Sequence, residues 1–150
     1  METDADMASC LLMTDPLRAL IVDDSLAARE VAEASLEAVA ERLGLDFDIE
    51  KVENGLAALK VLATSDIDFL IVDLHMPDIH GLEVLSFWHQ RDHVGARFAV
   101  VVSTAVSAHD KEKAMGTGAS AFLEKPLSGD ALAPIVASFN AGGPEQGDKA

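Results

Sequence analysis

Three apolar segments that lie far apart in the chain each end in charged residues. The first ends in Asp23 and Asp24, the second in Asp73 and the third in Lys125. If these segments are neighbouring strands of a parallel sheet, their carboxyl ends meet at one edge, which in an open α/β sheet is where ligands bind. We therefore expect the four side chains to form one site.

The chemistry of such a site follows from its charges. Two carboxylates about 4 Å apart repel each other by roughly 4 kcal/mol at an effective dielectric constant of 20. A divalent cation relieves this repulsion, and hard oxygen ligands favour Mg²⁺ or Mn²⁺. Magnesium leaves coordination positions open for a phosphoryl oxygen, and Lys125 adds a further positive charge. A cation, a lysine and a nucleophilic carboxylate are the parts that phosphoryl transfer onto aspartate requires.

Composition excludes several other classes of protein. The chain has 150 residues, 49% of them hydrophobic and 25% charged, which is typical of one globular domain. A net charge of −15 leaves no basic face for nucleic acid, and no apolar run reaches the length of a membrane span. The acidic N-terminus lacks the positive charge of a secretory signal, and a lone Cys10 cannot form an internal disulfide. These features predict a cytoplasmic protein.

The pattern divides the chain into one domain and two tails. Residues 1–15 and 141–150 carry little periodicity, and we expect both to be flexible tails around a domain of residues 16–140. We interpret Cys10 as an incidental residue of the first tail. The alternative, a reactive thiol, would need an activating base beside it.

Within the domain, strand-like and helix-like segments alternate. In the first helix, for example, Ala28, Ala32, Leu36, Val39 and Leu43 recur at helical spacing, with Asp24 or Ser25 as its N-cap and Gly44 as its end. The expected strands are 18–23, 47–52, 67–73, 97–103 and 119–124, and the expected helices are 25–43, 56–64, 81–91, 107–116 and 128–139. Five such pairs predict a flavodoxin-like (βα)5 fold, with a five-stranded parallel sheet in the order 2-1-3-4-5 and helices on both faces.

Several short motifs occur in order on these elements. Over about residues 17–139 the chain resembles the receiver domain of two-component response regulators, of the stand-alone chemotaxis-receiver type. The resemblance is carried by the motifs at residues 21–25, 53–59, 73–82, 118–119 and 125–126. An acidic pair after a strand is by itself no more than a common helix cap, so the argument depends on all the motifs together.

The resemblance implies a role for each site residue. Asp73 would accept a phosphoryl group from a phosphohistidine on a histidine kinase or a histidine phosphotransfer protein. The metal ligands would be Asp23, Asp24, Asp73 and the backbone carbonyl of His75. Lys125 would pair with Asp73 and then with the phosphoryl oxygens. The bond from Lys125 to Pro126 would be cis, which is accessible to an X–Pro bond.

The family also has a switch hydroxyl and a switch aromatic residue. Ser103 lies 30 residues after Asp73 and 22 before Lys125, which fits both family spacings, and Thr104 is the alternative. Phe122 takes the aromatic position. After phosphorylation the hydroxyl would bind a phosphoryl oxygen and leave space for Phe122.

The implied function is that of a single-domain receiver. Phosphorylation would shift its binding to a downstream protein, through the face formed by residues 107–116, 119–124 and 128–139. Apart from its own aspartyl phosphorylation and dephosphorylation it would not be an enzyme. With no output segment expected after the last helix, regulation would pass through another protein.

The alternative is a pseudo-receiver that binds partners without phosphorylation. A phosphatase of the haloacid dehalogenase type is disfavoured because it needs a second aspartate two residues after the first.

A few residues depart from the family pattern. His80 stands where an acidic residue is common, Thr104 where alanine or glycine is common, and Pro134 lies inside the last expected helix, where it can kink the helix. The 49 residues between Asp24 and Asp73 are a few more than usual. His89 and His93 have the spacing of a metal pair, but a solvated helix end is the preferred interpretation because no third ligand is evident nearby.

Overall fold

The computed structural model describes residues 16–91, 93, 97–105 and 107–140, so the two expected tails lie outside the described residues. Strands and helices alternate along this part of the chain. The strands are β1 (Leu17–Val22), β2 (Phe47–Val52), β3 (Phe69–Asp73), β4 (Phe98–Ser103) and β5 (Ala121–Glu124). The helices are α2 (Leu26–Leu43), α3 (Gly55–Thr64), α4 (Gly81–Gln90), α5 (Ala108–Thr117) and α6 (Gly129–Asn140). Each expected element is present, with its ends shifted by at most two residues.

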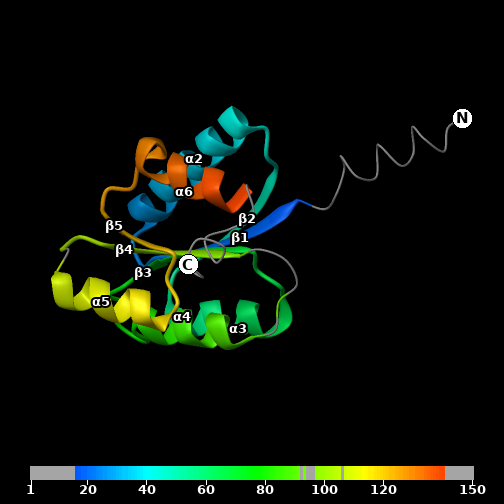
Figure 1. Ribbon diagram of the computed structural model, residues 1–150. Coiled ribbons are helices and arrows are strands. Elements are labelled where there is room, and N and C mark those ends of the chain that lie inside the picture. Colours follow the sequence, from blue (N-terminus) through cyan, green and yellow to red (C-terminus); the bar gives the residue numbers. More distant parts are fainter. Residues whose placement is uncertain (1–15, 92, 94–96, 106, 141–150) are drawn as a thin grey trace, which may run out of the picture.

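The strands form one parallel sheet in the order β2-β1-β3-β4-β5, which confirms the predicted flavodoxin-like topology. Helices α2 and α6 cover one face of the sheet, and α3, α4 and α5 cover the other (Figure 1). The alternating sequence of β2 predicts a half-exposed strand at the edge of the sheet. In the structure β2 is an edge strand, and its residues alternate between half-buried and exposed over most of its length.

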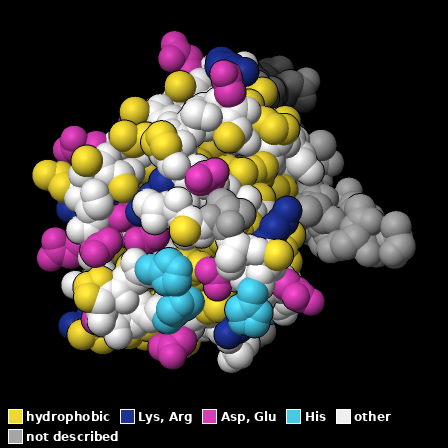
Figure 2. All heavy atoms as spheres, turned by 90° about the vertical axis from the view of Figure 1, so that its left-hand side faces the viewer, with side chains coloured by type: hydrophobic (Ala, Val, Ile, Leu, Met, Phe, Trp, Pro, Cys, Tyr) yellow, Lys and Arg dark blue, Asp and Glu magenta, His cyan; other side chains and the backbone are white. Residues whose placement is uncertain are grey.

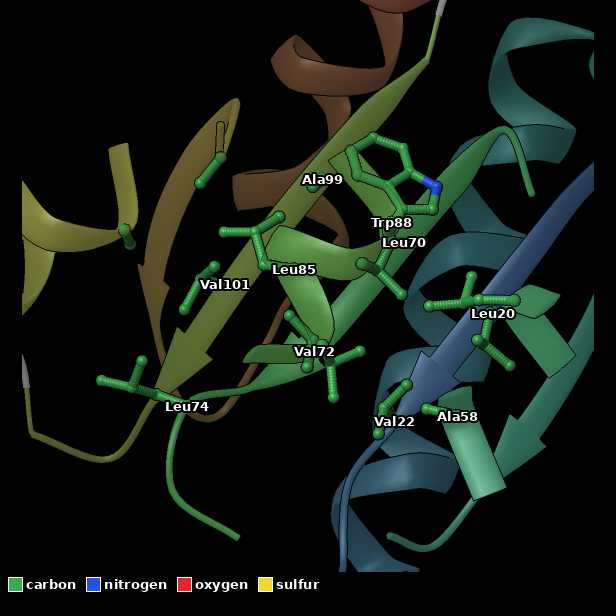
Figure 3. Packing of buried hydrophobic residues seen from close by; sticks show 14 of the residues in the cluster. Leu20, Val22, Ala58, Leu70, Val72, Leu74, Leu85, Trp88, Ala99 and Val101 are labelled. Atoms are coloured by element: carbon green, nitrogen blue, oxygen red, sulfur yellow. The ribbon is translucent and has the colours of Figure 1, made fainter. Parts of the chain in front are cut away.

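Two hydrophobic layers hold the helices on the sheet. On the face of α3, α4 and α5, the core includes Leu20, Val72 and Val101 (Figure 3). On the face of α2 and α6, Ile21 and Phe69 belong to a second cluster. Since successive side chains of a strand point to opposite faces, each buried strand contributes to both layers. No helix in the described ranges is long and apolar enough to cross a membrane.

Local capping residues set the ends of the helices around the site. Ser25, one of the two expected N-caps, accepts a hydrogen bond from the backbone N–H of Ala28 at 3.2 Å. Gly44 ends α2 in the left-handed conformation, with φ of 72°, which favours glycine. Pro134 lies within α6, which continues to Asn140.

The register of the strands brings the predicted site together. Val22 pairs with Val72, and Asp73 pairs with Val102 on the next strand. Val102 in turn pairs with Leu123. The residues that follow β1 and β5 therefore lie on either side of the end of β3.

The start of α4 lies close against the end of β3. A Cβ atom on Gly81 would lie 2.2 Å from the backbone oxygen of Asp73 and 2.8 Å from Leu74 Cα. Since backbone atoms cannot move aside without displacing the strand, we expect Gly81→Ala to lower the free energy of unfolding by about 1–3 kcal/mol in urea denaturation.

Gly116 in α5 provides the matched control. A Cβ atom there would meet nothing within 4 Å. We expect Gly116→Ala to leave stability unchanged or to raise it by about 0.5–1 kcal/mol, since alanine restricts the unfolded chain. Equal stability of the two variants would contradict the close approach of α4 to β3.

Candidate functional site

The turn between β1 and α2 holds the first two carboxylates in different environments. Asp23 is buried, and its Oδ1 accepts a hydrogen bond from the backbone N–H of Ser25 at 2.9 Å. Asp24 is exposed. The guanidinium of Arg29, one turn along α2, donates to the backbone oxygen of Asp23 at 2.7 Å. The turn is thus fixed from both sides, with one carboxylate directed inward and one open to solvent.

Lys125 joins the ends of β1 and β3. Its Nζ lies 2.7 Å from Asp23 Oδ2 and 3.4 Å from Asp73 Oδ1. Asp73 is buried, with 5% of its surface exposed. The backbone N–H of Lys125 donates to the oxygen of Ser103 at 2.8 Å, which extends the pairing of β4 and β5 beyond the last strand residue. The peptide bond from Lys125 to Pro126 is cis.

The three carboxylates form a group that suits a hard divalent cation. One oxygen from each of Asp23, Asp24 and Asp73 lies within 4.8 Å of the others. Carboxylate oxygens are the ligands that Mg²⁺ and Mn²⁺ prefer. At this separation each pair of charges repels by about 3–4 kcal/mol at an effective dielectric constant of 20, and one ammonium group offsets only part of that. The donor set and its excess of negative charge therefore fit a magnesium ion.

The pKa values of the site reflect this balance. Burial, and then the charge of Asp23, raise the pKa of Asp73 above its ordinary value of 3.8, although Lys125 acts in the opposite direction. Burial alone would lower the pKa of Lys125, but its hydrogen bond to Asp23 and the two negative charges outweigh burial and raise it above 10.5. Lys125 is therefore a fixed cation, while Asp73 is more basic than an ordinary aspartate and a better nucleophile once it is ionised.

The loop from β3 to α4 is fastened at two points. The carboxylate of Asp78 accepts hydrogen bonds from the backbone N–H groups of Gly55 (3.1 Å) and Leu56 (3.0 Å) at the start of α3. These bonds, led by the one from Leu56, lower the pKa of Asp78. His80 caps α4, since its Nδ1 accepts from the backbone N–H of Leu82 at 3.2 Å. Histidine at this position therefore performs a structural task.

His75 precedes both of these points in the loop. Its side chain is exposed, with Nε2 3.8 Å from Asp110 Oδ2 and its ring 5.4 Å from that of His80. On the surface at the carboxyl edge of the sheet, histidine side chains gather in the lower half of the view (Figure 2). The use of the His75 backbone carbonyl as a metal ligand stays a prediction, because the observed contacts are those of its side chain.

The two candidate switch hydroxyls differ in their surroundings. Ser103 is fully buried, and its Oγ donates to the backbone oxygen of Ala105 (2.9 Å) and accepts from its N–H (3.2 Å). Thr104 is exposed. The Ser103 hydroxyl is thus held by its own loop, so it would have to leave Ala105 to bind a phosphoryl oxygen.

Phe122 packs on the face of α3, α4 and α5, in the same cluster as Val101 and Ala114. It is 9% exposed. The expected sequence of events has Phe122 enter vacated space after phosphorylation, whereas here the ring is already buried while the Ser103 hydroxyl still bonds to Ala105.

The two histidines with metal-like spacing do not form a pair. Helix α4 ends at Gln90, before His93, whose Nδ1 lies 2.6 Å from Asp66 Oδ1 and whose Nε2 lies 3.2 Å from Asp68 Oδ1. The His89 ring instead lies over Gly118, where a Cβ atom would be 2.6 Å from Nδ1. The preferred interpretation, a solvated helix end, fits His89, which is exposed near the end of α4, but it is wrong for His93, which lies beyond the helix with only 3% of its side chain exposed because it packs between Asp66 and Asp68.

Sequence reasoning missed Arg29 and Asp78. The spacing of Arg29 from Asp24, just over one helical turn, could have suggested a side chain that reaches back to the turn. Asp78 gave no such signal, because the helix that it caps begins 23 residues earlier in the chain.

Comparisons with known proteins agree with this geometry. The sequence profile of the response regulator receiver domain matches residues 19–137. The histidine-protein kinase BarA of Escherichia coli is 26% identical over 123 residues, which are 82% of this chain and 13% of BarA. The response regulator MprA of a Mycobacterium species is 30% identical over 134 residues, which are 88% of this chain and 54% of MprA.

A solved structure gives the same result. The CheY-like receiver domain from Methylobacillus flagellatus has a TM-score of 0.68 at 27% identity, covering 83% of this chain and 99% of that one. The chain spans only part of its curated relatives, about half of MprA and a far smaller part of BarA. With its five-stranded sheet, its acidic group and its lysine at one edge, the chain belongs to the family of response regulator receiver domains.

Proposed function

We propose that this receiver domain accepts a phosphoryl group on Asp73 in a Mg²⁺-dependent reaction. One observation carries the proposal: Asp73, Asp23 and Asp24 lie together at the end of the sheet, with Lys125 bridging the first two. Pseudo-receivers, which bind partners without phosphate, have no need for a buried nucleophile beside a cation and two further carboxylates.

The transfer needs little covalent chemistry from the protein. An ionised Oδ of Asp73 attacks the phosphorus of a phosphohistidine, a P–O bond forms as the P–N bond breaks, and the imidazole nitrogen recovers a proton. Asp23, Asp24 and Asp73, with the His75 carbonyl, would hold a magnesium ion, which would neutralise charge on the phosphoryl oxygens when bound. Lys125, which already reaches Asp73, stabilises the same charge from the β5 side.

The response to phosphorylation would begin at Ser103. Phosphoaspartate adds negative charge and acceptor oxygens, and these compete with Ala105 for the Ser103 hydroxyl. Since Phe122 is already buried, the loop after β4 would carry more of the change than the aromatic ring. That loop leads into α5, so the face formed by α5, β5 and α6 would present the change to a downstream protein.

The partners follow from the reaction. A histidine kinase or a histidine phosphotransfer protein would supply the phosphoryl group. Among the similar proteins, BarA is named a signal transduction histidine-protein kinase. A second, RpfC of Xanthomonas campestris, is named a sensory/regulatory protein. The same proposal holds that this domain acts alone, in the cytoplasm and without turnover of a substrate.

The first prediction concerns the acceptor. With radiolabelled acetyl phosphate and Mg²⁺, the wild-type chain should incorporate label, and Asp73→Asn should reduce incorporation to background because the amide is not a nucleophile. Asp48→Asn, on the exposed edge strand β2, is the control and should label normally. Removal of Mg²⁺ with a chelator should stop labelling of the wild-type chain and of Asp48→Asn. Label retained on Asp73→Asn would mean that another residue accepts the phosphoryl group, and no label on the wild-type chain would support the pseudo-receiver alternative.

A second prediction uses the raised pKa of Asp73. Between 3.8 and the folded pKa, the folded state binds more protons than the unfolded state, so the free energy of unfolding falls as pH rises through this range. At about pH 7 and without Mg²⁺, Asp73→Asn should therefore be more stable than the wild-type chain in urea denaturation. The difference should shrink as the pH approaches 4. A variant less stable at neutral pH would mean that the pairing with Lys125 outweighs burial.

A third prediction separates the two hydroxyls. Beryllofluoride, which mimics the phosphoryl group on aspartate, should shift the amide resonances of α5 and β5 in the wild-type chain and in Thr104→Ala. Ser103→Ala should bind the mimic but show much smaller shifts there, because the link between the phosphoryl group and the loop is lost. The reverse pattern would identify Thr104 as the switch residue.

A further inference from the structure

A cavity of about 350 Å³ lies between α2 and the sheet, directly beside the acidic site. Its walls are Ala28 and Ala32 of α2, Ile71 and Val102 of the sheet, and the segment after β5 that includes Leu127. Hydrophobic side chains gather in the upper half of the face at the carboxyl edge of the sheet, above the histidines (Figure 2). Because Asp23 and Lys125 also line it, the cavity lies beside the site at the carboxyl edge of the sheet.

The cavity exists because small side chains stand where α2 crosses the ends of the strands. Ala27, Ala28 and Ala32 line it, whereas farther along the same helix Leu36 and Val39 are fully buried and fill the space against the sheet. Ala27 and Val31, which also line the space, are exposed, so the cavity is open to solvent. It is more than twice the volume, roughly 150 Å³, of an apolar cavity that binds benzene.

The polar groups are confined to one end of the cavity. Asp23, Thr104 and Lys125 line it there, and Asp23 and Lys125 are paired with each other at 2.7 Å. Asp24 and Asp73 lie in the same acidic group, so three carboxylates face one ammonium and an anionic ligand would be repelled. Elsewhere the lining is almost wholly aliphatic. Mostly apolar pockets with a few polar groups at one end are typical of small-molecule sites.

We propose that this cavity binds a small neutral ligand with an apolar ring system of roughly 10–14 non-hydrogen atoms and a single hydrogen-bonding group directed at Asp23 and Lys125. The ligand would lie against α2, with its apolar part between Ala28, Ile71 and Leu127.

Such a ligand would influence the acidic site because the two share a wall. A hydrogen bond from the ligand to Asp23 competes with the pairing of Asp23 with Lys125, and the release of Lys125 favours its alternative partner, Asp73. Ligand and Mg²⁺ should then alter each other's affinity, by the same factor in both directions. This coupling rests on the proposed function, whereas binding to the cavity does not.

The test uses the full chain, labelled with ¹⁵N, without any phosphodonor. The probe is 2-naphthol, a neutral bicyclic phenol, and the comparison probe is 2-naphthoate, which has the same ring system and a negative charge. We expect 2-naphthol to bind saturably with a dissociation constant of about 0.1–1 mM, with the largest amide shifts at the start of α2 and at residues 125–127. The naphthoate should bind at least tenfold more weakly, and Mg²⁺ should change the dissociation constant of 2-naphthol at least twofold.

Variants locate the site. Ala28→Leu should fill the cavity and weaken 2-naphthol binding at least tenfold, and Ala28→Met serves the same purpose if the leucine variant does not fold. Ala34→Leu, at an exposed position of the same helix, is the matched control and should bind within twofold of the wild-type chain.

Two results would overturn the inference: the absence of saturable binding of 2-naphthol to the wild-type chain, and equal binding of 2-naphthol by the Ala28 and Ala34 variants. Neither result depends on whether Asp73 is phosphorylated, so the proposed function stands or falls separately. If 2-naphthol does not bind, slower phosphorylation of Ala28→Leu by a phosphorylated kinase, but not by acetyl phosphate, would assign the cavity to an apolar side chain of the partner protein.

Discussion

The bridge from Lys125 to Asp23 and Asp73 is the interaction on which the arrangement of the site depends. Two of the three neighbouring carboxylates are buried, and their mutual repulsion opposes folding. The ammonium group lies closer to Asp23 than to Asp73, 2.7 Å against 3.4 Å, so the nucleophile is the less neutralised of the two. Burial, and then the charge of Asp23, raise the pKa of Asp73, and Lys125 offsets only part of this increase. The same repulsion and burial thus make Asp73 more reactive and the folded state less stable. A bound cation would relieve the repulsion.

The alternation of side chains along the strands divides the site between the two faces of the sheet. Ile71 belongs to the layer beneath α2 and α6, and Asp73, two residues later, points the same way and meets Lys125 there. Phe122 lies in the opposite layer, beneath α3, α4 and α5, and so does Val101, two residues before Ser103. Charge is therefore concentrated on one side, while the groups that could respond to it lie on the other. The end of β4 connects the two.

How much of this could be predicted depended on the range over which each signal acts. The strand ends were predictable because an apolar run that stops at a charged residue marks both the strand and its edge, as at Asp73 and Lys125. The first helix was predictable from its own periodicity and from Gly44. Asp78 at the start of α3, and the carboxylates on either side of His93, were not, because these contacts join residues more than twenty positions apart and depend on how loops meet after folding.

The cavity shows a different limit of sequence reasoning. Ala28 and Ala32 recur at helical spacing and were interpreted as part of the apolar face of the first helix, which is where they lie. Periodicity identifies which side of a helix faces the sheet, but it does not measure whether the side chains are long enough to reach it. Leu36 and Val39 reach the sheet and are fully buried; the alanines one and two turns earlier leave the space open. Since α2 begins at the acidic turn and is tied to it by Arg29, any molecule that fills this space lies against the backbone that positions Asp23. The first two turns of α2 therefore act as part of the site as well as part of the scaffold.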